Sequence, residues 1–169
     1  MALVPATLQA GILSALTTVQ ANPAATPADV AALWASAYQS YAGLAQNVLG
    51  FPPSVVNYPG LQTKLIAAFA LHTDLASAAS DLADAFVLYW TGALFGATGP
   101  VVFPGNKALL VGLLVAAWTG NLAAGVTVTL PQVAQQMASA LDAFTRTVMA
   151  GDAVLPIPPG TGTPPAPIM

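Results

Sequence analysis

The sequence contains no cysteine, a single histidine and very few charged residues. Without cysteine the chain can form neither a disulfide framework nor a thiol active site, and one histidine cannot supply a zinc finger. Only three residues are lysine or arginine, which is too few to neutralise a run of nucleic-acid phosphates. We therefore expect no nucleic-acid partner, no metal and no cofactor.

Charge is scarce over the whole chain. Charged residues make up 5% of the 169 positions, whereas soluble proteins usually carry about 25%. Hydrophobic residues make up 56%, and the net charge is only −3, so copies of the chain repel one another weakly. Because the cores of interfaces are depleted in charge, this composition favours a protein that packs against copies of itself or against other subunits.

Prolines, glycines and capping residues divide the chain into helices. Pro5 suits a first helical turn, and Thr26-Pro27-Ala28-Asp29 is typical of an N-cap followed by proline and a carboxylate. Bulky residues recur at steps of three and four, as they do on one face of a helix. The expected helices run from Pro5 to about Gln20, from Pro27 to about Gly50, from Tyr58 to about Tyr89 (with a break near His72 and Thr73 as an alternative), from Lys107 to about Leu122, and from Pro131 to Gly151.

Three segments are not expected to be helical. Residues 96–106 are rich in Gly and Pro, which predicts an irregular loop. Residues 126–129 alternate Val and Thr, which indicates a short strand or an extended linker. Six of the last eighteen residues are proline, so this segment should form neither helix nor sheet. We predict a mainly α-helical fold, with a bundle of about five helices over residues 1–151 and a Pro-rich extended C-terminal arm over residues 152–169.

Residues 8–45 and residues 109–148 resemble each other and could be an internal repeat. At an offset of 103 positions Trp34 is aligned with Met137 and Tyr41 with Phe144, while the preceding helices match at an offset of 101. The bulky positions and the prolines agree as well as the alanines, although chance is the alternative in a chain so rich in alanine. A true duplication would give two related helical hairpins around the long third helix.

Candidate catalytic and metal-binding residues form no convincing site. His72 with Asp74 and Ser77 formally allows a Ser-His-Asp arrangement, but no serine lies in a nucleophile elbow. Asp81 and Asp84 lie one turn apart on the face expected to be solvated, where solubility explains them better than paired-carboxylate chemistry. No Glu, second His or calcium loop supports a metal site. We predict no catalytic, cofactor-binding or metal-binding residue, and we do not expect an enzyme.

Three aromatic residues, Trp34, Tyr38 and Tyr41, share one face of the second expected helix. Such a face could form a box for a ligand. Packing in a hydrophobic core is the more ordinary use of this spacing, and we take it as the expected one.

A membrane protein inserted through residues 85–126 is the alternative class. This stretch carries one charge, Lys107, and about 20 apolar residues would suffice for a spanning helix. However, glycines and prolines interrupt it, its dense apolar core from Ala108 to Trp118 is short, and orienting basic residues are nearly absent. The N-terminus also lacks the basic region of a secretory signal, so we expect a helix there. A membrane location therefore ranks second.

The segment Gln20-Ala-Asn-Pro-Ala-Ala-Thr-Pro27, the following Leu33-Trp34-Ala-Ser-Ala-Tyr38 and the Ala-rich helices resemble small structural proteins of tailed-phage virion gene clusters. The resemblance implies a component of the phage head, neck, tail or baseplate, assembled in the host cytoplasm, and it transfers no functional residue. A pre-extended arm loses little entropy when it lies along a neighbour, so we expect the arm to make contacts. The candidate interaction residues are Pro156, Pro158, Pro159, Pro164, Pro165, Pro167 and Ile168.

Overall fold

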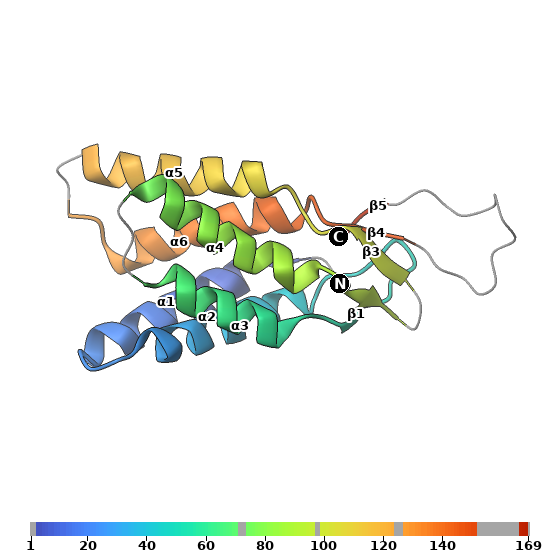
Figure 1. The fold of residues 1–169 in the computed structure, drawn as a ribbon, viewed down its shortest axis with the longest axis horizontal. Coiled ribbons are helices and arrows are strands. Elements are labelled where there is room, and N and C mark those ends of the chain that lie inside the picture. The colour runs from blue at the N-terminus through green and yellow to red at the C-terminus, as the bar shows by residue number, and fades with distance from the viewer. Residues whose placement is uncertain (1–2, 71–73, 97–98, 124–126, 152–165, 169) are drawn as a thin grey trace, which may run out of the picture.

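The fold is that of a computed structural model, which describes residues 3–70, 74–96, 99–123, 127–151 and 166–168. Its described part is mainly helical and ends in a small antiparallel sheet (Figure 1). The helices are α1 (Pro5–Ala21), α2 (Pro27–Ala42), α3 (Tyr58–Ala68), α4 (Leu75–Trp90), α5 (Lys107–Ala123) and α6 (Leu130–Thr145). The strands are β1 (Pro53–Val55), β2 (Leu94–Phe95), β3 (Gly99–Phe103), β4 (Met149–Ala150) and β5 (Ala166–Pro167).

The six helices form a closed ring around one hydrophobic core. Each helix packs against the next one along the chain, and α6 returns to pack against α1. The strands lie together at one end of this ring (Figure 1). We call the six helices the helical body, and we call the five strands with the loop 43–52 the sheet end.

Side-chain caps begin several of the helices. The Thr26 hydroxyl accepts a hydrogen bond from the Asp29 backbone N–H at 3.3 Å, and the Asp29 carboxylate accepts one from the Thr26 N–H at 2.8 Å. Thr129 and Gln132 form the same capping box at the start of α6. Such caps satisfy backbone donors that the first helical turn leaves without partners. The predicted starts of α2 and α6 are confirmed to within one residue.

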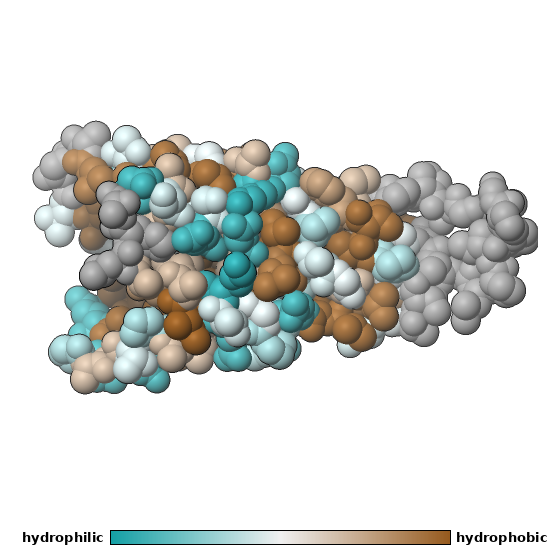
Figure 2. Space-filling view, viewed as in Figure 1, coloured by the Kyte–Doolittle hydropathy of each residue, from teal (hydrophilic) through white to brown (hydrophobic). Residues whose placement is uncertain are grey.

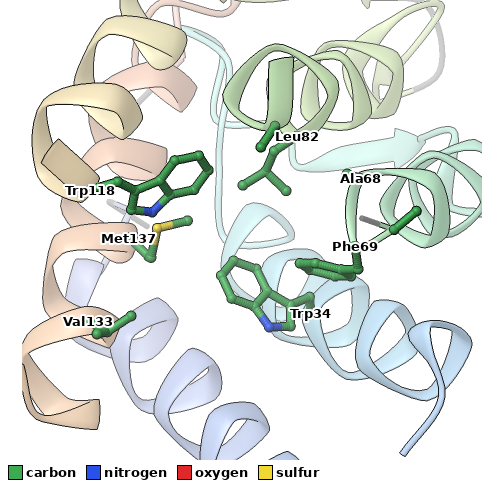
Figure 3. Close-up of a pocket in the computed structure, with 9 residues that line it drawn as sticks. Trp34, Ala68, Phe69, Leu82, Trp118, Val133 and Met137 are labelled. Atoms are coloured by element: carbon green, nitrogen blue, oxygen red, sulfur yellow. The ribbon is translucent and has the colours of Figure 1, made fainter. Parts of the chain in front are cut away.

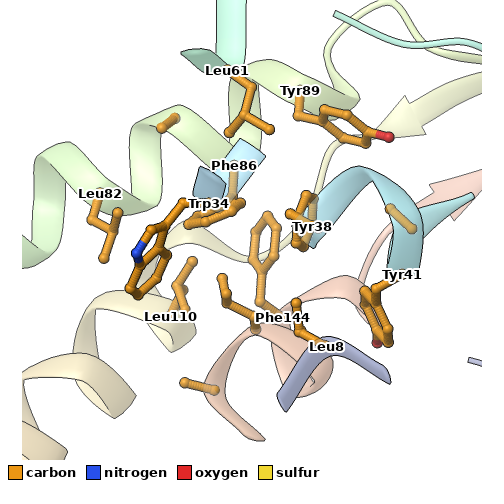
Figure 4. Packing of buried hydrophobic residues seen from close by; sticks show 14 of the residues in the cluster. Leu8, Trp34, Tyr38, Tyr41, Leu61, Leu82, Phe86, Tyr89, Leu110 and Phe144 are labelled. Atoms are coloured by element: carbon orange, nitrogen blue, oxygen red, sulfur yellow. The ribbon is translucent and has the colours of Figure 1, made fainter. Parts of the chain in front are cut away.

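The core of the helical body is dominated by aromatic side chains from α2, α4 and α6 (Figure 4). Tyr38 lies at its centre, with its ring 4.6 Å from the ring of Phe86 and 5.2 Å from that of Tyr89. The Tyr38 hydroxyl accepts a hydrogen bond from Trp90 Nε1 and shares another with the Thr145 hydroxyl, both 2.8 Å long. One buried hydroxyl therefore joins three helices. These hydrogen bonds favour one particular packing of α2, α4 and α6 over other apolar packings.

All neighbouring strands of the sheet pair antiparallel, in the order β1-β2-β3-β4-β5. The β2–β3 hairpin forms the middle of the sheet, with Phe95 opposite Gly99. The Phe95 ring stacks on the Trp90 ring at 5.9 Å, with an interplanar angle of 4°. The sheet is thus anchored to the last residue of α4, and through Trp90 to the centre of the core.

The sequence-based prediction of a mainly helical chain is confirmed, but several boundaries are wrong. The expected second helix ends at Ala42 rather than near Gly50, because the chain then forms a loop and β1. The expected third helix is two helices, α3 and α4, because Asp74 caps a new helix: its carboxylate accepts from the Ser77 N–H at 2.8 Å. This is the alternative of a break near His72 and Thr73, which themselves lie outside the described residues.

Three further predictions need correction at the sheet end. Residues 96–106, expected to be an irregular loop, contain the strand β3. The last helix ends at Thr145 instead of Gly151, and the residues that follow form β4. The C-terminal segment, expected to contain no sheet, contributes β5. By contrast, residues 127–129 form neither helix nor strand, in agreement with the linker alternative.

The geometry of the two segments of the possible repeat is similar. The helices α1 and α5 are both 17 residues long, and α2 and α6 are both 16 residues long. Their capping boxes, Thr26 with Asp29 and Thr129 with Gln132, lie at the same offset of 103 positions as the aromatic residues. Duplication of a helical hairpin remains a prediction, and these features are consistent with it.

Candidate interaction surface

Large apolar side chains are exposed together at the sheet end. In Figure 2 several brown residues lie over the strands at the right, and others are scattered over the helices. Between 42% and 51% of the area of each of these side chains is accessible to water. We call this patch the sheet-end surface, and it consists of Val48, Leu49, Phe51, Val55, Val102 and Phe103.

The sheet end is also free of charge. Segments 43–57, 91–106 and 166–168 contain no Asp, Glu, Lys or Arg, and neither do residues 147–151. The charged residues of the described chain all belong to helices or to their caps. An apolar patch with no charged residue in its own segments has the composition of the buried centre of a protein interface.

A buried asparagine holds the loop that carries half of the sheet-end surface. Asn47 is 2% exposed, and its side-chain Oδ1 accepts hydrogen bonds from the N–H groups of Leu49 at 3.1 Å and Phe51 at 2.9 Å. Its own N–H donates to the Phe51 carbonyl oxygen at 3.0 Å. These bonds close a tight loop, so Val48, Leu49 and Phe51 are presented outward by a fixed backbone rather than by a free segment.

The C-terminal end of the chain contacts its own body. Met149 and Ala150 of β4 pair with Pro167 and Ala166 of β5, and the Ile168 N–H donates to the Val148 carbonyl oxygen at 3.0 Å. Ile168 is 3% exposed and belongs to the hydrophobic core.

Ile168, a candidate contact with a neighbour, is buried in its own chain, and its contact with a neighbour stays a prediction. Pro167 is exposed. The other five candidates, Pro156, Pro158, Pro159, Pro164 and Pro165, lie outside the described residues.

The acidic residues considered for catalysis have structural partners. The Asp74 carboxylate caps α4 and also accepts a hydrogen bond from the Ser77 hydroxyl at 2.8 Å. Asp84 forms an exposed ion pair with Lys107 at 2.8 Å, which links α4 to α5. Asp81 lies on the exposed face of α4, and His72 is outside the described residues. Within the described residues no cluster of three His, Cys, Asp or Glu could hold a metal ion.

The aromatic face of α2 is part of the core, as expected, and includes polar contacts that the sequence did not predict. The Tyr41 hydroxyl donates a 2.5 Å hydrogen bond to Asp142, and Arg146 binds the same carboxylate through Nε at 2.8 Å and Nη2 at 3.1 Å. Burial raises the pKa of Tyr41 and of Tyr38 above the usual range. Both phenols therefore stay protonated, and they act as fixed hydrogen-bond partners between α2 and α6. The i, i+4 spacing of Asp142 and Arg146 was the only signal in the sequence.

Comparisons of this chain with protein-family models, with curated proteins and with solved structures find no match. Among the helices of the described residues, none has both the length and the apolar character that a bilayer crossing requires. Function is therefore argued from the composition and the geometry of the surface.

Proposed function

We propose that this protein is a non-enzymatic structural subunit of a large protein assembly, which it joins through the sheet-end surface. The observation that carries the proposal is the combination found there: six large apolar side chains exposed on a rigid framework, in segments without a charged residue. Large apolar residues exposed at one end of a molecule are costly to leave in water, and their clustering is typical of a contact site.

The edges of the sheet add a second way to bind a neighbour. The strands β1 and β5 end the sheet on its two sides. An edge strand presents backbone N–H and C=O groups that can pair with a strand of another molecule. The proposed partner is a second copy of the chain or another subunit with an apolar, uncharged face, because the net charge of −3 opposes close packing of copies only weakly.

We propose further that the assembly is a tailed-phage particle, with the protein in its head, neck, tail or baseplate. The support for this step is the resemblance of residues 20–38 and of the Ala-rich helices to virion structural proteins. The Pro-rich residues 152–165 would then add contacts between subunits, as a segment that needs little ordering when it binds.

Self-association tests the role of the sheet-end surface. We expect the purified protein to form oligomers whose mass, measured by light scattering after size exclusion, rises with concentration. The variant Val102→Glu places a charge in the surface and should shift the protein to monomer. The matched control is Ile66→Glu, which changes a side chain of α3 that is 41% exposed and should leave the oligomer intact. A wild-type chain that stays monomeric at millimolar concentration would contradict the proposal.

Co-sedimentation tests the phage assignment. Particles from a lysate of the producing host are separated on a density gradient, and the chain is quantified by mass spectrometry. We expect it to migrate with the particles in a fixed ratio to the major capsid protein. Its absence from particle fractions would rule out the virion role, and retention with lipid after carbonate extraction would favour the membrane alternative instead.

The proposed contacts of the arm need a variant that keeps Ile168 in the core. Truncation at residue 152 would remove this buried side chain and confuse stability with binding. Replacing residues 152–165 by a six-residue Gly/Ser linker should still allow β4 and β5 to pair, because hairpins close with loops this short. We expect unchanged circular dichroism and reduced incorporation into particles. Incorporation equal to that of the wild type would show that the arm makes no contact.

A further inference from the structure

The helical body contains a pocket of about 340 Å³, in the part of the ring away from the sheet. Five of the six helices, α2 to α6, or the residues directly after them contribute to its wall. Figure 3 shows Trp34, Phe69 and Leu82 on one side of the space, and Trp118, Met137 and Val133 on the other. The remaining lining residues are Ala68, Ala70 and Ala78.

The side chains that line this pocket are all hydrocarbon, thioether or aromatic. No charged residue lines it, and its three rings come from two tryptophans and one phenylalanine. The ring centroids of Trp34 and Phe69 lie 5.4 Å apart in an edge-to-face contact with an interplanar angle of 64°. This contact favours one orientation of the two rings in the pocket wall. Because no charged side chain lines the pocket and its polar surface is small, burying a charged group there would be costly.

The pocket is deep on one side and reaches the surface on the other. Trp34, Leu82 and Met137 are at most 6% exposed, whereas Phe69 and Trp118 are half-buried and Ala70 is exposed. An occupant of the pocket would therefore rest against core side chains on its inner side. Ligand sites in proteins combine these features: they are concave, mostly apolar and built from several elements.

We propose that this pocket binds an uncharged, apolar small molecule of about the size of two fused aromatic rings. The size follows from the volume, because a cavity of about 150 Å³ lined by aliphatic and aromatic side chains accommodates benzene, and this pocket has about twice that volume. The chemical class of the ligand follows from the side chains in the wall. On the pocket side these side chains have no atoms in van der Waals contact, and an apolar ligand would supply such contacts. The inference is independent of the proposed assembly role.

Calorimetric titration with two matched probes, 1-naphthol and 1-naphthoate, tests the proposal. They share the ring system, but at neutral pH only the second carries a charge. We expect 1-naphthol to bind with one-to-one stoichiometry and at least tenfold more tightly than 1-naphthoate. Equal affinity for the two probes, or no heat from 1-naphthol up to its solubility limit, would overturn the proposal.

Two alanines of the same helix provide the variant and its control. Ala78 lines the pocket and is half-buried, whereas Ala76 is exposed on α4. Ala78→Phe should fill the pocket and weaken 1-naphthol binding at least tenfold, and Ala76→Phe should leave the affinity within twofold of the wild type. Binding that survives Ala78→Phe would place the probe elsewhere, for example on the sheet-end surface, and would overturn the assignment.

A second variant that fills the pocket, Val133→Phe, repeats the test from α6 if circular dichroism shows that Ala78→Phe does not fold.

Titrations at several protein concentrations test whether the pocket is filled by a small ligand or by a side chain of a neighbouring copy. We expect the affinity to be independent of protein concentration. A loss of probe binding that follows the formation of oligomers would mean that a second copy fills the pocket, and would overturn the proposal.

Discussion

The helical body and the sheet end differ in where most of their large apolar residues lie. In the helical body the largest side chains, such as Tyr38, Phe86 and Phe144, are fully buried, although Leu122 of α5 is exposed. The charged residues lie at the surface of this body, apart from the partly buried Asp142. At the sheet end Phe51, Val102 and other large side chains are exposed, in segments without a charge. The helices therefore supply most of the buried core, whereas the sheet end combines a few core residues, such as Phe95 and Ile168, with more than half of the exposed large apolar residues of the described chain.

The largest expected effect concerns the centre of the helical body. Phe144 is fully buried between the helices, so Phe144→Ala should lower the free energy of unfolding by about 3–5 kcal/mol. Urea denaturation at a fixed protein concentration measures the change. The matched control is Phe103→Ala on the exposed strand β3, for which we expect a change within about 0.5 kcal/mol. If both variants lose the same free energy of unfolding, the difference between the buried core of the helical body and the exposed sheet end is contradicted.

Ile168 tests whether the C-terminal strand is part of the fold. Its side chain is 3% exposed, so Ile168→Ala should cost about 2–5 kcal/mol in the same denaturation experiment. Its neighbour Pro167 is exposed, and Pro167→Ala should change stability by less than about 0.5 kcal/mol. If Ile168→Ala is as mild as Pro167→Ala, the end of the arm is not held by the core.

Two glycines lie at corresponding positions of the possible repeat, and their substitution by alanine should change the stability in opposite directions. A Cβ on Gly11 would lie 2.8 Å from the Cβ of Ala37, so Gly11→Ala should push α1 and α2 apart at a cost of about 1–3 kcal/mol. A Cβ on Gly112 meets no atom within 4 Å, and Gly112→Ala should stabilise α5 by up to about 1 kcal/mol. Melting temperatures of both variants measure this difference. Two shifts of the same sign would contradict the packing described here.

The smallest expected effect is the contribution of a charged helix cap to stability in acid. Hydrogen bonds from the backbone and the hydroxyl of Thr26 hold the pKa of Asp29 below its ordinary value of 3.8. A lowered pKa in the folded state means that the stabilisation is present above about pH 4 and is lost as the pH falls through the folded pKa. Asp29→Asn should therefore reduce the melting temperature at pH 6 by more than at pH 2.5. A pH-independent difference would show that the carboxylate charge has no role in the cap.

The helices could largely be predicted because their signals are local. Pro5, Thr26 and Pro131 mark helix starts through backbone geometry and capping, which do not depend on distant residues. Asp74 was considered as a formal partner of His72, although a residue of this type followed by Ser77 can also begin a helix. Without this cap, α3 and α4 were predicted as one long helix, with a break near His72 and Thr73 as the alternative.

The sheet could not be predicted because its strands are too short to show a period. The strands β2, β4 and β5 have two residues each, and β3 includes Gly99 and Pro100. Pro167 lacks a backbone N–H, yet it is tolerated in β5 because an edge strand needs hydrogen bonds on one side only. The pairing of β4 with β5 joins residues separated by more than a dozen positions, which no local pattern encodes.

The sequence by itself determined the class of fold and the scarcity of charge, because helix caps, periodicity and composition are properties of short segments. Only the tertiary structure decided where the apolar residues are placed. The sequence does not reveal that Phe51 and Val102 lie exposed at one end, that Ile168 enters the core, or that Trp34 and Trp118 face a common pocket. Each of these depends on which elements pack together, and packing is decided by contacts between residues far apart in the chain.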